Sequence, residues 1–268
     1  MIKIKPRINT KIIMNNLAKA NAVRLINKYC FKSPKELIND LENMLYAEGL
    51  YIKEEEINDC EGKILFDNNC GVITVDSMSD DKQKRFTIAH EAGHFFNEKG
   101  SGSYKCSFDE FYGSKRNYER EANANDFAGE LLMHEKWFVE FTGSQKISYE
   151  LLSSTAEYFD VSLSAVAFRY SIIGFHPIAV VMSTNKIIKW VSINKNFSYQ
   201  FIRVGNKVSD LSYAYDFFEN KEIPKYEDIP AEAWFKEDFK LKNRNARIME
   251  MNIPMKKYNS VLSVLWEM

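Results

Sequence analysis

The sequence predicts an α+β protein: a mainly helical N-terminal domain with a small β-hairpin or sheet, a helix-turn-helix-like pair, and a small α+β C-terminal domain. Two observations predict this order. Apolar residues recur at helical spacing through much of residues 12–175, whereas from residue 177 they gather in short runs separated by turn residues. We therefore expect domains at 1–140, 141–176 and 177–268.

The composition is that of a globular protein. The chain has 268 residues, of which 45% are hydrophobic and 14% aromatic, enough for a sizeable core. No apolar stretch approaches the roughly 18 residues of a membrane span, and the N-terminus lacks a secretory pattern, so we expect a cytoplasmic protein without membrane association. A net charge of −1 disfavours strong non-specific binding of nucleic acid. The four cysteines form no C-x-x-C pair, so neither a zinc ribbon nor a disulfide framework is indicated.

The first elements are two helices and a hairpin. Helical periodicity runs through residues 12–48, with Ser33-Pro34 as the start of the second helix and Gly49 as its end. The apolar runs 63–66 and 72–75 are joined by DNNCG, which predicts a hairpin. Val72 to Val75 is either an edge strand that pairs with an extended substrate or part of an ordinary core hairpin.

The next helix carries the most informative pattern in the chain. Residues 86–94 read FTIAHEAGH, preceded by capping residues at 79–81. Positions i and i+4 share one face of a helix, so His90 and His94 can bind one Zn²⁺. Glu91 can then hold and deprotonate a water bound to the metal.

A third ligand is expected on the following helix, at 118–133 (YEREANANDFAGELLM). Glu121 is the candidate, and Asn125, one turn further on, is placed to hydrogen-bond a ligand imidazole. Small residues on both helices permit the close approach that short metal–ligand distances require. Glu119 and Glu130 are the competing ligands, although most helical glutamates simply lie on a solvated face.

These two segments resemble the ImmA/IrrE family of zinc metallopeptidases, a gluzincin-like group. The resemblance rests on RFTIAHEAGH and on the motif from Glu121 to Met133, and is tightest over residues 50–135. The family usually has Pro after Leu-Leu-Met; here the residue is His134, which adds a weaker alternative ligand. The resemblance implies cleavage of a helix-turn-helix repressor in phage-like, mobile-element or stress-response circuits.

The remaining segments carry less chemistry. Residues 98–116 predict a loop, and Tyr104, Tyr112 and Tyr118 in or near it are candidates for stabilising an oxyanion. Residues 146–175 predict a helix-turn-helix-like pair, but its second helix offers only Arg169 as a cation, so we expect a packing element rather than a DNA reader.

Residues 177–268 predict two pairs of strands with a helix between them, and the family resemblance suggests a GAF-like fold. His176 at the boundary is expected to be structural.

The sequence therefore predicts a zinc-dependent endopeptidase with one Zn²⁺ per chain. His90, His94 and Glu121 are the expected ligands, and Glu91 is the expected general base. The expected substrate is a separate helix-turn-helix repressor. The alternative is a non-proteolytic, zinc-containing regulatory module that binds a repressor or an antitoxin.

Overall fold

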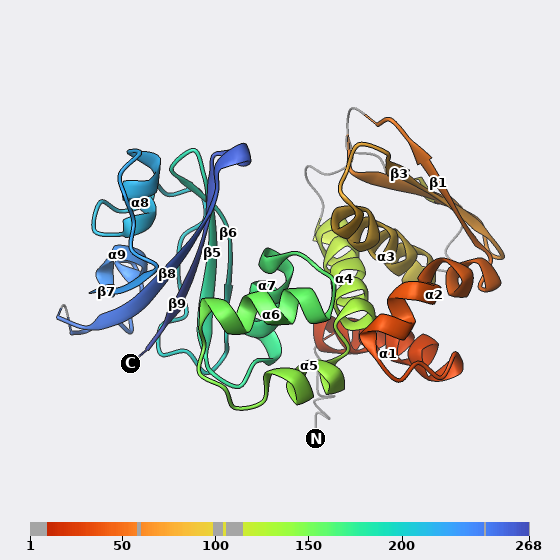
Figure 1. Ribbon diagram of the computed structural model, residues 1–268, viewed down its shortest axis with the longest axis horizontal. Helices are drawn as coiled ribbons and strands as arrows, with labels where there is room; N and C mark the ends of the chain where they lie inside the picture. Colours follow the sequence, from red (N-terminus) through yellow and green to blue (C-terminus); the bar gives the residue numbers. More distant parts are fainter. Residues whose placement is uncertain (1–9, 58–59, 99–103, 106–114, 244, 268) are drawn as a thin grey trace, which may run out of the picture. The chain divides into compact units, whose positions relative to one another are not determined.

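The computed structural model describes residues 10–57, 60–98, 104–105, 115–243 and 245–267 (Figure 1). By its internal contacts the chain divides into two compact units, Met1–Phe138 with Glu157–Ser162, and Val139–Ala156 with Leu163–Met268. Both units combine helices with a sheet, which confirms the α+β class. The boundaries expected at residues 140 and 176 stay a prediction.

The first unit contains helices around a four-stranded sheet. Its elements are α1 (Thr10–Lys28), α2 (Pro34–Ala47), β1 (Leu50–Glu55), β2 (Gly62–Phe66), β3 (Gly71–Asp76), α3 (Asp81–Glu98), β4 (Tyr104–Lys105) and α4 (Lys115–Leu132). The predicted cap of α2 is present, because the Ser33 side chain accepts a hydrogen bond from the backbone N–H of Glu36. Gly49, at a φ of 90°, ends that helix as expected.

The hairpin is present, but β3 is an interior strand. The order in the sheet is β1-β3-β2-β4, with β3 parallel to β1 and antiparallel to β2. The backbone groups of Val72 to Val75 are therefore used in ladders on both sides, and the prediction that this segment is an edge strand for substrate is wrong. Among the described strands, β1 and β4 form the edges.

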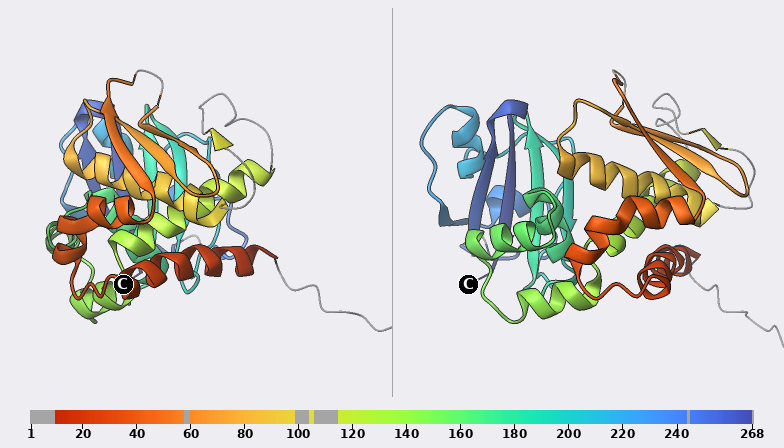
Figure 2. Two further views of the ribbon diagram at one scale, coloured as in Figure 1. Left: turned by 90° about the vertical axis from the view of Figure 1, so that its right-hand side faces the viewer. Right: turned by 45° about the vertical axis from the view of Figure 1, so that its right-hand side comes forward.

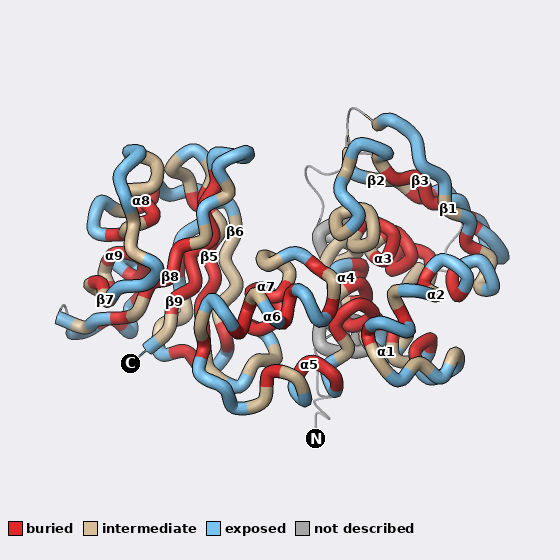
Figure 3. The backbone as a smooth tube through the Cα atoms, viewed as in Figure 1, coloured by how far each residue is buried: buried red, intermediate tan, exposed pale blue. Residues whose placement is uncertain are grey.

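Helix α3 lies between the sheet and helices α1 and α4 (Figure 2). Its start is capped by Asp80, whose Oδ1 accepts a hydrogen bond of 2.9 Å from the backbone N–H of Gln83. Because it is covered on two sides, its middle is buried almost without a break from Thr87 to Phe95 (Figure 3). Two ionisable residues in this stretch, Glu91 and His94, are buried with it.

Close packing of α3 on α4 depends on Gly93. A Cβ at this position would lie 2.9 Å from the Cα of Ala124, 3.0 Å from its carbonyl oxygen and 3.2 Å from the Cβ of Phe127. Real Cβ atoms do not come this close to a backbone, so the small residue sets the distance between the two helices.

We expect Gly93→Ala to destabilise the protein by about 1–3 kcal/mol, because the methyl group forces the helices apart. Gly129→Ala in α4 is the matched control, because a Cβ there meets nothing within 4 Å. Alanine suits a helix interior better than glycine, so the control should stabilise the chain by up to about 1 kcal/mol. Urea unfolding monitored by circular dichroism measures both. Equal effects of the two substitutions would contradict this role of Gly93.

The predicted loop at 98–116 lies mostly outside the described residues. Within it, residues 104 and 105 form the short strand β4, which pairs with Leu65 and Phe66 of β2. Tyr112 and the side chains of Tyr104 and Tyr118, named above as oxyanion candidates, also lie outside what the structure describes.

The next three elements are helices: α5 (Glu135–Thr142), α6 (Tyr149–Tyr158) and α7 (Leu163–Ile173). The last two form the predicted pair, separated by a turn in which Asp160 has a φ of 47°. Arg169, the cation of the second helix, is only 3% exposed, so its charge is not displayed to a DNA backbone.

The second unit is built on an antiparallel five-stranded sheet. Its strands are β5 (Ile178–Thr184), β6 (Ile187–Ile193), β7 (Tyr226–Pro230), β8 (Arg247–Met255) and β9 (Ser260–Trp266), in the order β6-β5-β9-β8-β7. Helices α8 (Tyr213–Phe218) and α9 (Glu232–Phe235) cover one face, and a 3₁₀ turn (Lys256–Tyr258) joins the last two strands. The sequence did not predict β7 or α9, because YEDIP is charged and the helix is a single turn.

None of the helices in the described residues combines the length and the apolar character needed to cross a lipid bilayer.

Candidate metal centre

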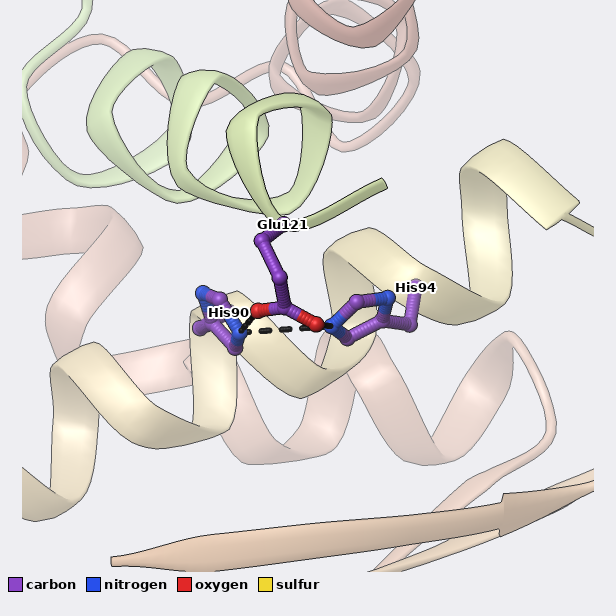
Figure 4. Close-up of side chains that lie close together, drawn as sticks. All are labelled: His90, His94 and Glu121. Carbon is purple, nitrogen blue, oxygen red and sulfur yellow. Dashed lines mark hydrogen bonds and ion pairs between the residues drawn. The ribbon is translucent and has the colours of Figure 1, made fainter. Parts of the chain in front are cut away.

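Two imidazoles and a carboxylate meet between α3 and α4. Figure 4 shows Glu121 reaching from α4 to His90 and His94 on α3. The His90 Nε2 lies 3.2 Å from one oxygen of Glu121, and the His94 Nε2 lies 3.4 Å from the other. The two Nε2 atoms are 3.3 Å apart. The sequence prediction that these three residues share one site thus corresponds to one compact cluster in the structure.

The separations test whether a metal would fit. Zinc bound tetrahedrally to N and O ligands at about 2.0–2.1 Å has ligand atoms about 3.3–3.4 Å apart. The two imidazole Nε2 atoms are 3.3 Å apart, which matches such an edge, and each of them lies 3.2–3.4 Å from a different oxygen of the Glu121 carboxylate. Two imidazole nitrogens that face each other also need a cation between them, either a proton or a metal, because two lone pairs repel. The residues present therefore fit a zinc-sized ion.

The neighbours of the cluster fix the orientation of the imidazoles. Asn125 Oδ1 lies 3.0 Å from His90 Nδ1, the contact expected from the sequence. The corresponding nitrogen of His94 lies 2.9 Å from Glu98 Oε1, and Glu98 is paired with Arg120. Sequence reasoning missed Glu98 and Arg120, although the spacing of Glu98, four residues after His94, was a usable signal.

Glu91 is buried beside the cluster without a full set of partners. Its exposed fraction is 3%, and its Oε2 has no hydrogen-bond partner among the described residues. Burial raises the pKa of Glu91 above the usual carboxyl value, although the nearby His90 and His94 act in the opposite direction. A buried carboxylate with an unused oxygen is costly for stability, which points to a use other than holding the fold together.

The residues named above as alternative metal ligands lie outside the cluster. Glu130, which the sequence left as a possible ligand or a solvated side chain, is 2% exposed. It is 2.7 Å from His134 Nδ1 and accepts a hydrogen bond from the backbone N–H of Glu135, so it links the end of α4 to the start of α5. Among the described residues, the potential metal-binding cluster includes none of the three competitors, Glu119, Glu130 and His134.

In the metal-free chain, the ionisable groups of the cluster shift one another's pKa values. Burial by itself lowers the pKa of His94, but its hydrogen bonds to Glu121 and Glu98 outweigh this and raise the pKa to about 9. Burial acts to raise the pKa of Glu121, but hydrogen bonds from His90 and His94 lower it to about 2. Without metal, the Glu121 and Glu98 carboxylates thus favour the protonated form of His94.

Comparison with known proteins identifies the family to which this segment belongs. The family described as the IrrE N-terminal-like domain (Peptidase_M78) matches residues 34–171, a range that includes all three cluster residues. The chain belongs to this family. The search of the curated proteins finds no match.

The fold is shared with a solved structure. A Mycobacterium tuberculosis transcriptional regulator superimposes with a TM-score of 0.56 at 14% sequence identity, over 94% of this chain and 77% of that one. At this identity the likeness concerns the fold alone.

We expect zinc binding to the metal-free protein at pH 7.5 to release about one proton, because zinc requires a neutral His94 while the metal-free imidazole has a pKa of about 9. His94, whose pKa is raised, stabilises the metal-free fold fully below its unfolded pKa of 6.5, and this stabilisation is lost as the pH rises through about 9. Calorimetric titration in two buffers of different ionisation enthalpy counts the protons. A heat independent of the buffer would contradict the protonated state of His94.

Proposed function

We propose that this protein is a zinc-dependent endopeptidase that cleaves a helix-turn-helix transcriptional repressor and thereby relieves repression. The observation that carries the proposal is the clustering of two imidazole nitrogens and the Glu121 carboxylate, close enough to bind one metal ion, with the buried carboxylate of Glu91 beside them. A site that only stabilised the fold would not need that carboxylate.

His90, His94 and Glu121 are the residues that would hold the zinc. When bound, zinc supplies a Lewis acid that polarises the scissile carbonyl and lowers the pKa of a water molecule to about 7. Asn125 accepts a hydrogen bond from His90 Nδ1 and so keeps the Nε2 lone pair of that imidazole available to the metal.

Glu91 is the proposed general base. Its carboxylate takes a proton from the attacking water and later gives that proton to the leaving amine. Burial favours this exchange, because it raises the pKa of Glu91 and so brings it closer to the pH of the reaction.

The class of substrate has separate support. Membership of the IrrE N-terminal-like family supports peptidase chemistry, and the resemblance to ImmA/IrrE peptidases points to a repressor as the target. The solved structure that shares the fold is itself named a transcriptional regulator. A regulator within a transcriptional circuit is therefore the proposed substrate, rather than bulk protein.

The test uses zinc-loaded wild type and Glu91→Gln, each incubated with a panel of helix-turn-helix regulators from the same genome. Mass spectrometry of the products reads the cleavage sites, and casein serves as the non-specific control. We expect wild type to cut one regulator at a defined bond and to leave casein largely intact. Cleavage of none, together with a stable complex, would instead support a non-proteolytic module that binds a repressor or antitoxin.

A further inference from the structure

The two histidines of the cluster differ in the group that contacts their Nδ1 atom. His90 Nδ1 contacts Asn125, a neutral amide on an exposed residue. His94 Nδ1 instead lies 2.9 Å from the Glu98 carboxylate, and the His94 side chain is fully buried. One imidazole thus has a neutral partner and the other an anionic one.

Glu98 is itself held from the neighbouring helix. Its other oxygen pairs with the guanidinium of Arg120, which directly precedes Glu121 on α4. The contacts run from Glu121 to His94, from His94 to Glu98 and from Glu98 to Arg120. Because Arg120 and Glu121 are adjacent in the chain, these contacts close into a ring through the backbone of α4. Helix α4 therefore supplies two groups to this arrangement. Glu121 contacts His94 directly, and Arg120 pairs with Glu98, the carboxylate on the other side of His94.

Glu98 is a carboxylate that is largely removed from water. The last described turn of α3 contains no basic residue that could pair with it. Its side chain is only 13% exposed, so its charge is costly to bury without partners. Arg120 and the imidazole N–H offset this cost, and neither contact would be needed if residue 98 were neutral.

We propose that Glu98, oriented by Arg120, is a positioning residue for the metal ligand His94. It keeps the proton of His94 on Nδ1, turns the Nε2 lone pair toward His90 and Glu121, and makes that nitrogen a stronger donor than it would be beside a neutral group. This inference rests on the proposed function, because it takes His94 to be a metal ligand.

The test measures metal binding by the whole chain rather than hydrolysis. Zinc affinity is obtained by competition with a chromophoric chelator, and the visible absorption of the cobalt-loaded protein reports the ligand field. We expect Glu98→Gln to weaken zinc binding about 10–100-fold and to shift the cobalt bands, because loss of a partner of this kind has effects of that size. Glu98→Asp should restore part of the affinity, since it keeps the charge.

The pairing of Arg120 with Glu98 leads to a second prediction. Arg120→Gln should weaken zinc binding in the wild-type background but add little to Glu98→Gln, because Arg120 acts through Glu98. Glu119→Gln is the matched control: it neutralises a carboxylate adjacent to Arg120, outside the cluster, and should leave affinity and spectrum unchanged.

The possible results distinguish a failure of the proposed role of Glu98 from a failure of the proposed peptidase function. If Glu98→Gln lowers only the thermal stability of the metal-free protein and leaves zinc affinity and the cobalt spectrum unchanged, Glu98 is merely structural and the inference is wrong. A wild type that binds zinc and shows the Glu98 effects, yet cleaves no regulator, contradicts the proposed peptidase function and leaves the inference intact.

Discussion

Replacing Glu91 by glutamine is expected to slow peptide hydrolysis about 10²–10⁴-fold, the usual contribution of a general base. An amide has almost the same shape as a carboxylate but cannot take a proton from water. The Michaelis constant should change far less than the turnover number, because Glu91 is assigned to the transfer of protons and not to the binding of substrate.

The fold and the metal site should survive this substitution. Glu91 is 3% exposed and its Oε2 has no hydrogen-bond partner in the described parts of the chain, so the amide breaks no contact at that atom and is cheaper to bury than a charge. Metal analysis and circular dichroism check both points. Turnover within a few-fold of wild type would remove Glu91 from the mechanism.

The second large effect concerns Glu121. We expect Glu121→Gln to weaken zinc binding by more than about 100-fold, above the range seen when only a supporting neighbour of a ligand is lost. The carboxylate, with a pKa of about 2, is ionised throughout the physiological range, whereas an amide oxygen carries no charge to offer a metal.

Glu119→Gln is the matched control for this prediction. It makes the same chemical change two residues away on the same helix, about 200° around the helix axis, and Glu119 has no place in the cluster. Competition with a chelator measures both affinities. A strong effect of Glu119→Gln with little effect of Glu121→Gln would show that the metal uses the other face of α4.

Several features follow from local sequence alone. The i, i+4 spacing of His90 and His94 places both imidazoles on one face once a helix forms, and Asp80 supplies the cap that starts this helix. The pairings of β2 with β3 and of β5 with β6 were readable because each joins adjacent runs through a short turn. The small residues that allow α3 and α4 to approach were visible in the same way.

Tertiary structure decided how the sheet is ordered. Strand β1 pairs in parallel with β3, which lies beyond the next strand in the sequence, and this insertion turns β3 from a possible edge into an interior strand. Long-range pairing of this kind leaves no local signal, because residues 50–55 would have the same alternating pattern beside any neighbour.

Tertiary structure also decided what each carboxylate does. In the sequence Glu91, Glu98, Glu121 and Glu130 are all helical glutamates, and three of them were considered while Glu98 was not. Their differences arise from what approaches them in space: two imidazoles for Glu121, His94 and Arg120 for Glu98, and the start of α5 for Glu130. The local pattern sets the face of the helix on which a side chain lies. The charge and hydrogen-bonding role of that side chain depend on elements that fold against it from elsewhere in the chain.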